Sequence, residues 1–145
     1  MGPKSGQGSA EPPRERIERL VAEGLMPWAA VEQAERLWQE RLRHSVTMPN
    51  GEQVWITLDD LYHVIVDSRI WRHPERIVRA LESVFEIRAL EHGRRLAFSR
   101  WYEGGRERLA ALVLYPDRTL RTMHLIDERR LRRYTRKVGE VVWRQ

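Results

Sequence analysis

Two histidines near the middle of the chain are the residues best suited to proton transfer. His63 falls on a predicted helix and points away from its apolar stripe, and His73 precedes the proline that opens the next helix. An imidazole titrates near neutral pH, so one histidine can remove a proton while the other donates one. The N-terminus of a helix also attracts phosphate. Both positions therefore suit acid–base chemistry on a phosphodiester, the alternative being surface histidines with no catalytic role.

Two predicted strands supply polar side chains that can act on the same phosphate. Strand alternation places Arg100 and Tyr102 on one face of the first, and Thr122 and His124 on one face of the second. An arginine among apolar neighbours suits an anion site, and a tyrosine can stack on a base or donate a proton. If Thr122 lines a cleft, His124 does as well.

The sequence predicts neither a cofactor nor a metal. It contains no Gly-x-Gly-x-x-Gly, no P-loop and no Gly-x-Ser-x-Gly. The absence of cysteine excludes disulfides, thiolate ligands and a cysteine nucleophile. The spacing of His63 and Asp67 on a helix gives at most two ligands, which is too few for a metal site.

Positive charge favours nucleic acid as the first class of partner to consider. The net charge is +5, and 24 of the 26 cationic side chains are arginine. Residues 118–145 alone hold nine basic and three acidic side chains. Arginine forms bidentate hydrogen bonds with phosphate and stacks on bases, although charge runs are often ordinary solvated surface. The residues expected to contact nucleic acid are Arg72, Arg76, Tyr102, Arg121, Arg129, Arg132 and Arg133.

The elements that must position these residues predict an α+β fold. Apolar spacing, caps and turn residues place helices before a mostly antiparallel set of strands, with no strand–helix–strand alternation to suggest a parallel sheet. The predicted architecture is an N-terminal helical hairpin followed by helices packed on a twisted antiparallel sheet of about four strands. Helices are expected at 14–23, 27–43, 57–67, 74–85 and 127–137, a hairpin at 45–56, and strands at 86–90, 94–102, 107–115 and 118–126, with 141–143 a candidate edge strand.

One stretch of the chain resembles a known family. The run Leu58–Ile65 followed by Trp71-Arg72-His73-Pro74-Glu75 resembles the helical opening of nuclease-like domains of phages and mobile elements, the barnase–EndoU–colicin–RelE group. The resemblance continues through the order of the later elements, ending at a strand with a Val-x-Thr pattern, here Leu120-Arg121-Thr122. It covers about residues 46–126. The chain departs from the pattern after Thr122, where the family has a small residue and then an aromatic one.

The resemblance implies a small α+β domain that cuts RNA without metal, associated with phages or toxins. It matches His63, His73 and Thr122 to the family's polar positions, and strand geometry adds Arg100 as a phosphate clamp. The ribose 2′-hydroxyl is then the nucleophile, so the protein must only move protons and stabilise charge. The expected division is a disordered tail at 1–13, a helical extension at 14–44 and a nuclease-like domain at 45–145, in a cytoplasmic protein. Which histidine is the base and which the acid stays open.

Three alternatives remain at this stage. The domain can bind nucleic acid without cutting it, because a fold does not determine a function. It can be a protein-interaction or phage-assembly component that docks through residues 14–44. It can also be a toxin whose helical hairpin binds a neutralising partner. No apolar run is long enough to span a membrane, so no membrane partner is expected.

Overall fold

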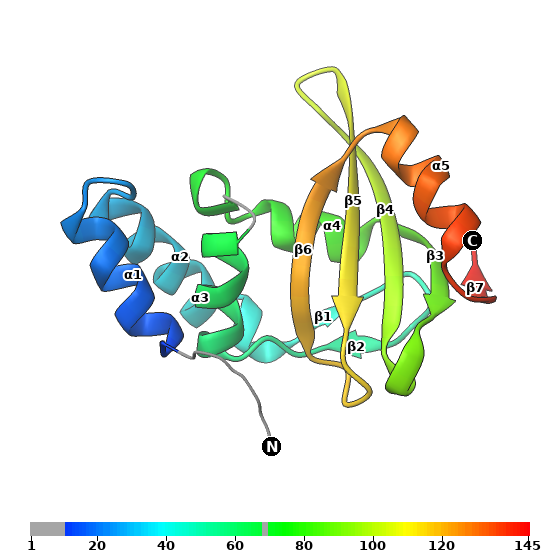
Figure 1. Cartoon of the computed structure of the whole chain (residues 1–145), viewed down its shortest axis with the longest axis horizontal. Helices are drawn as coiled ribbons and strands as arrows, with labels where there is room; N and C mark the ends of the chain where they lie inside the picture. The colour runs from blue at the N-terminus through cyan, green and yellow to red at the C-terminus, as the bar shows by residue number, and fades with distance from the viewer. Residues whose placement is uncertain (1–10, 68–69) are drawn as a thin grey trace.

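The computed structural model describes residues 11–67 and 70–145, and within them the fold is α+β (Figure 1). This confirms the predicted class. Residues 1–10 of the predicted disordered tail lie outside the described residues. The helices are α1 (Pro13–Ala22), α2 (Trp28–Glu40), α3 (Leu58–Asp67), α4 (Arg76–Glu82) and α5 (Glu128–Lys137). The strands are β1 (Val46–Thr47), β2 (Gln53–Val54), β3 (Val84–Ala89), β4 (Arg95–Glu103), β5 (Arg106–Leu114), β6 (Leu120–Ile126) and β7 (Val141–Arg144).

Strands β3 to β7 form one antiparallel sheet in the order β6-β5-β4-β3-β7, and β1 and β2 form a separate hairpin. The sheet therefore has five strands where about four were predicted, because the candidate edge strand at the C-terminus pairs with β3. Strands β4 and β5 pair along their whole length, from Arg95↔Leu114 to Glu103↔Arg106. This long central hairpin fixes which side chains share a face.

Both faces of the sheet carry buried residues, and each face packs against different elements. The first face carries Ala97, Trp101, Leu112 and Met123 and belongs to the larger core, which it shares with α3, α4 and the β1–β2 hairpin. The second face carries Leu96, Phe98, Leu109 and Ala111 and belongs to a smaller core with Leu131 of α5. In Figure 1, α5 lies over the β3–β4 side of the sheet, and no helix of the described residues covers β5 and β6 on that face.

Helix α1 is followed by a glycine whose backbone lies in the left-handed region. Gly24 has φ +76°, and the amide of Leu25 donates to the carbonyl of Leu20 at 2.9 Å. The amide of Gly24 donates to the carbonyl of Val21 at 3.0 Å. These two bonds form the Schellman motif that a glycine at this position favours.

A polar cluster ties α1, α2 and α3 together. Arg14 Nη1 donates to Glu35 Oε2 and to the hydroxyl of Tyr62, each at 2.8 Å, and that hydroxyl also donates to Glu35. Burial, together with the Glu35 carboxylate, raises the pKa of Tyr62 to about 12. Apolar residues of α1 and α2, including Ile17 and Val31, belong to the larger core. The segment at 14–44 therefore packs into the same core as the sheet.

Local sequence signals explain the start of α3 but overestimate α4. The hydroxyl of Thr57 accepts from the amide of Asp60 at 3.0 Å, and the Asp60 carboxylate accepts from the amide of Thr57 at 3.3 Å; these two bonds form a capping box. The helix predicted over 74–85 ends earlier, at Glu82. Val84 and Phe85 belong to β3 instead, because pairing with β4 and burial of Val84 in the larger core outweigh the helical spacing.

A buried carboxylate holds β7 onto the sheet. Glu86 of β3 accepts hydrogen bonds from Nε of Arg88 at 2.6 Å and from Nε of Arg144 at 2.8 Å. Burial alone raises the pKa of Glu86, but hydrogen bonds from the two guanidinium groups outweigh it and lower the pKa. Arg88 Nη1 also donates to the carbonyl of Thr135 at 3.2 Å. Glu86 and Arg88 together thus join β3, β7 and α5.

None of the helices in the described residues combines the length and apolar character needed to cross a bilayer.

Candidate nucleic-acid interface

Helix α5 is amphipathic because its apolar residues recur at helical spacing and therefore share one face. Its charges are also distributed along the helix as the dipole favours. Asp127 caps it by accepting from the amide of Arg130 at 2.7 Å. Leu131 is buried, and the ring of Tyr134 lies 6.0 Å from the ring of Phe98 on the sheet. The acidic Glu128 lies in the first turn, and the basic Arg136 and Lys137 lie in the last, the arrangement that the helix dipole stabilises.

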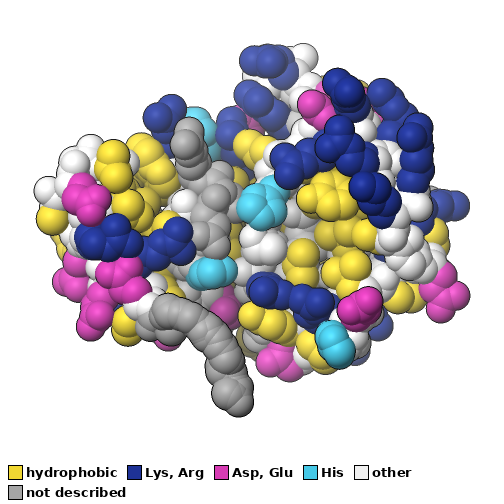
Figure 2. Space-filling view, viewed as in Figure 1, with side chains coloured by type: hydrophobic (Ala, Val, Ile, Leu, Met, Phe, Trp, Pro, Cys, Tyr) yellow, Lys and Arg dark blue, Asp and Glu magenta, His cyan; other side chains and the backbone are white. Residues whose placement is uncertain are grey.

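The rest of α5 presents positive charge, which we call the α5 cationic face. All its members are exposed, and no carboxylate of the described residues forms an ion pair with any of them. Its members are Arg129, Arg130, Arg132, Arg133, Arg136 and Lys137. Figure 2 shows Lys and Arg side chains gathered over α5 and the neighbouring end of the sheet, around a hydrophobic patch.

Many arginines on the other elements are neutralised by neighbouring carboxylates. Arg41 pairs with Glu82 at 2.8 Å, and Arg95 and Arg118 both pair with Glu52, at 2.8 and 3.2 Å. Glu52 balances only one of its two arginines, so some positive charge remains there, but among the described elements α5 carries the largest group of exposed cations. An anionic polymer is therefore attracted to this helix first.

The uncovered part of the sheet carries polar and aromatic side chains, which we call the β5–β6 platform; it extends from His124 toward the end of β5 and β6 that is opposite the start of α5. It consists of Tyr115, Arg121, Thr122 and His124. The hydroxyl of Thr122 and Nε2 of His124 lie 3.3 Å apart. The guanidinium of Arg121 stands 5.9 Å from the centre of the Tyr115 ring. Thr122 and His124 are half-buried, so both are accessible from the side of α5.

The pairing of β5 with β6 explains the shape of this platform. His124 lies opposite Ala111 and Thr122 opposite Val113, but the next pair joins Leu114 to Leu120. The bulge leaves Arg121 without a partner in the ladder. A bulge of this kind redirects side chains locally, and here it adds a cation beside the polar pair.

Arg100, the predicted phosphate clamp, lies on the same face of the sheet but is already engaged. Its Nη2 donates to Glu128 at 3.3 Å, its Nε lies 3.8 Å from Glu107, and its guanidinium stacks 5.2 Å from the ring of Phe85. Two carboxylates therefore balance its charge. Tyr102 is 65% exposed, and its hydroxyl donates to Glu107.

The two predicted catalytic histidines stand on elements of the other layer. His63 is half-buried on α3, and His73 is exposed between Arg72 and α4, with Nδ1 3.6 Å from Glu75. Both helices pack into the larger core, on the face of the sheet opposite α5. The structure thus places Arg100 and Thr122 together on one face and the two histidines with the opposite layer. The histidine on the face of Thr122 is His124, which strand alternation already indicated.

Two predicted cations of the α4 region have roles within the fold. Arg76 has a side chain only 12% exposed, and it donates from Nε and Nη2 to Glu103 at 3.1 and 2.5 Å. The hydrogen bond from Arg76 is the main cause that lowers the pKa of Glu103 to about 2. Arg72 is exposed, with its guanidinium 5.2 Å from the ring of Trp71. The remaining predicted contacts, Arg121, Arg129, Arg132 and Arg133, lie on the platform or on α5.

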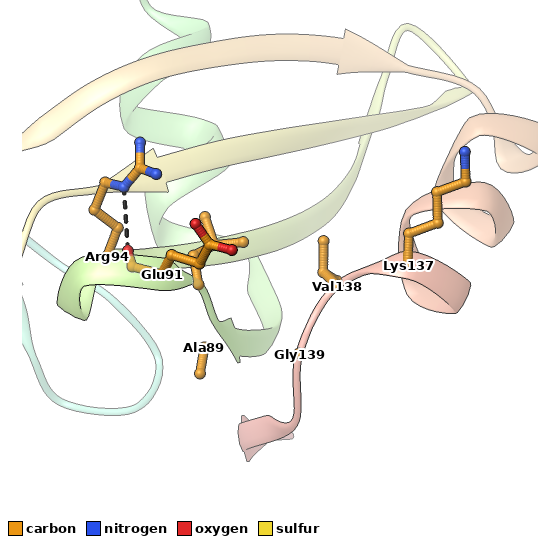
Figure 3. Close-up of a pocket in the computed structure, with 7 residues that line it drawn as sticks. Ala89, Glu91, Arg94, Lys137, Val138 and Gly139 are labelled. Atoms are coloured by element: carbon orange, nitrogen blue, oxygen red, sulfur yellow. Dashed lines mark hydrogen bonds between the residues drawn. The ribbon is translucent and has the colours of Figure 1, made fainter.

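Two cavities adjoin α5. The larger, about 530 Å³, lies between the end of the helix, the end of β3 and the turn at residues 91–93 (Figure 3). The smaller, about 200 Å³, lies on a flank of the helix and contains three of its cations. The two cavities share Lys137. In the described residues, no three His, Cys, Asp or Glu side chains are grouped closely enough to hold a metal ion.

Comparison with known protein families, with curated proteins and with solved structures finds no match for this chain.

Proposed function

We propose that this protein binds single-stranded RNA across the α5 cationic face and the β5–β6 platform. The observation that supports this proposal best is the set of six exposed cations on one helix with no carboxylate partner in the described chain. The cations of such a helix displace the counterions condensed on the phosphates of a nucleic acid, and the release of these ions favours binding whatever the nucleotide sequence.

The platform supports a single strand over a duplex. An open sheet surface with exposed rings can receive unstacked bases, which a duplex does not present. Tyr115 is 38% exposed, and Arg121 stands over its ring, so both can take part in stacking. The strand would then run with its phosphates along α5 and its bases toward β5 and β6.

Binding can be tested with a pair of matched double substitutions. Arg129→Gln with Arg132→Gln removes two cations from α5, whereas Arg36→Gln with Arg43→Gln removes two exposed cations near α2. We expect the α5 pair to weaken binding of a short fluorescein-labelled single-stranded RNA by about tenfold in an anisotropy assay, since two phosphate contacts are lost. The α2 pair should bind like the unmodified protein. Equal losses in both variants would mean that only net charge matters and would reject the interface.

Metal-independent cleavage of the bound RNA is a second candidate function. The observation that favours it is the Thr122–His124 pair, which lies on the face of the sheet against which α5 packs. The RNA 2′-hydroxyl attacks the adjacent phosphorus and forms a 2′,3′-cyclic phosphate while the bond from phosphorus to the 5′-oxygen breaks. His124 can accept the proton that the 2′-hydroxyl loses and return it to the leaving 5′-oxygen, and Thr122 can orient the imidazole. The roles predicted for His63, His73 and Arg100 belong to the same proposal.

One assay can show both whether the protein cuts RNA and which histidine the reaction needs. The protein is incubated with RNA and excess chelator, in parallel with His63→Ala, His73→Ala and His124→Ala. Loss of cleavage only in His124→Ala would assign the reaction to the platform, and loss in the other two variants would support the predicted histidine pair. Absence of cleavage in the unmodified protein would reject this candidate and leave RNA binding alone.

A further inference from the structure

One flank of α5 forms a cationic cup. Arg130, Arg133, Tyr134 and Lys137 line the cavity of about 200 Å³, at the i, i+3, i+4 and i+7 spacing that places them on one side of a helix. The cup contains three positive charges and no carboxylate. Tyr134 forms its wall with a ring that packs against Phe98, so this side of the cup is held by the core.

The cavity of about 530 Å³ beside the cup has a different chemistry. Its walls include the apolar side chains of Ala89, Leu90 and Val138. Figure 3 shows Glu91 and Arg94 on one side of this cavity and Lys137 on the other. Arg94 Nε donates to the main-chain carbonyl of Glu91 at 3.3 Å, and the Glu91 carboxylate lies 4.0 Å from Nε2 of His92.

The wall between the helix and the sheet is tight because a glycine forms it. A Cβ on Gly139 would lie 2.6 Å from the carbonyl oxygen of Ala89. The amide of Ala89 donates to the carbonyl of Glu140 at 2.9 Å, which fixes the two segments against each other. The larger cavity is therefore bounded by paired backbone and not by a loose loop.

We propose that the two cavities together bind a nucleoside 5′-monophosphate unit, with its terminal phosphate in the cup and its base in the larger cavity. A phosphate monoester carries a charge of about −1.5 to −2 near pH 7, whereas a phosphodiester carries a single negative charge. Three cations without carboxylate partners therefore suit the monoester better than the diester. The larger cavity has the size of a small-molecule site, roughly 300–1,000 Å³, and apolar walls suited to a flat ring. Glu91 and Arg94 can accept from and donate to the edge of a base.

Two sources can supply this unit, the 5′-phosphorylated end of an RNA strand or a free nucleotide. The RNA source rests on the proposed function, because the strand would continue from the cup onto the α5 cationic face. The free nucleotide does not depend on it. The experiment therefore compares four ligands: 5′-phosphorylated RNA, 5′-hydroxyl RNA of the same sequence, adenosine 5′-monophosphate and inorganic phosphate.

We expect the phosphorylated RNA to bind about tenfold more tightly than the hydroxyl RNA, a factor typical of additional charge-assisted hydrogen bonds. Arg130→Gln should abolish this preference, while Arg129→Gln, outside the cup, should weaken both RNAs and keep it. Binding of adenosine 5′-monophosphate that is lost in Arg130→Gln, with no end preference in RNA, would support the site as one for free nucleotides. It would do so even if the hydroxyl RNA failed to bind and the proposed function were rejected.

The larger cavity is tested separately through an exposed residue whose change should not affect folding. Glu91→Gln should weaken adenosine 5′-monophosphate and leave inorganic phosphate unchanged. If inorganic phosphate binds as tightly as the nucleotide, the larger cavity takes no base and the joint site is overturned. The joint site is also overturned if adenosine 5′-monophosphate does not bind and 5′-phosphorylated RNA binds no more tightly than 5′-hydroxyl RNA.

Discussion

Replacing Glu86 by glutamine should destabilise the protein more than the same replacement at an exposed glutamate. The side chain of Glu86 is 8% exposed, and it holds Arg88, 14% exposed, and Arg144, 60% exposed. Removing one partner of a fully buried ion pair costs about 3–5 kcal/mol. Arg144 can return to water, and glutamine keeps the volume and one acceptor, so we expect a cost of about 2 kcal/mol. In a chain of this size that lowers Tm by roughly 4–8 °C.

The assay is urea denaturation followed by circular dichroism and tryptophan fluorescence, with Glu82→Gln as the matched control. Glu82 pairs with Arg41 on the surface, where both side chains are 46% exposed, and such pairs contribute about 0–1 kcal/mol. Hydrogen exchange should also show faster opening of β7 in Glu86→Gln, because Arg144 anchors that strand. A Glu86→Gln protein as stable as Glu82→Gln would refute the structural role of this buried group.

Two further predictions concern packing and pH. Gly139→Ala should cost about 2 kcal/mol in urea denaturation, because its Cβ cannot fit 2.6 Å from the carbonyl of Ala89; an unchanged midpoint would show that the two segments are not in close contact. The lowered pKa of Glu103 means that its pair with Arg76 stabilises the fold fully above the ordinary carboxyl value of 4.5 and loses this effect as pH falls toward about 2. Glu103→Gln should therefore flatten the decline of the unfolding free energy over that range, and an unaltered pH profile would contradict the pairing.

Local signals in the sequence account well for where many elements begin and turn. The Thr57 capping box, Gly24 after α1 and Asp127 before α5 each satisfy backbone groups within a few residues of themselves. Strand alternation likewise explains why Trp101 is buried while its neighbour Tyr102 is exposed. These features depend on neighbours along the chain, so periodicity and residue type are sufficient to predict them.

Features that depend on distant partners were not predictable in the same way. Nothing near Glu86 in the sequence indicates Arg144 as its partner, because β7 reaches β3 only through the tertiary fold. The helical spacing of apolar residues over 74–85 predicted a helix through Phe85, so the start of β3 at Val84 was missed. For the candidate site, alternation correctly placed Thr122 with His124, but no local pattern could tell on which face of the sheet His63 would lie.

The central claim, that α5 is a phosphate-binding helix, is tested most directly by the salt dependence of RNA binding. The logarithm of the binding constant is measured against the logarithm of salt concentration from about 50 to about 200 mM, for the unmodified protein and for Arg129→Gln with Arg132→Gln. Each phosphate contact on a single strand contributes about 0.7 to the slope, so the variant should show a slope shallower by about 1.4. Identical slopes for the two proteins, or binding of the unmodified protein that is insensitive to salt, would contradict the claim.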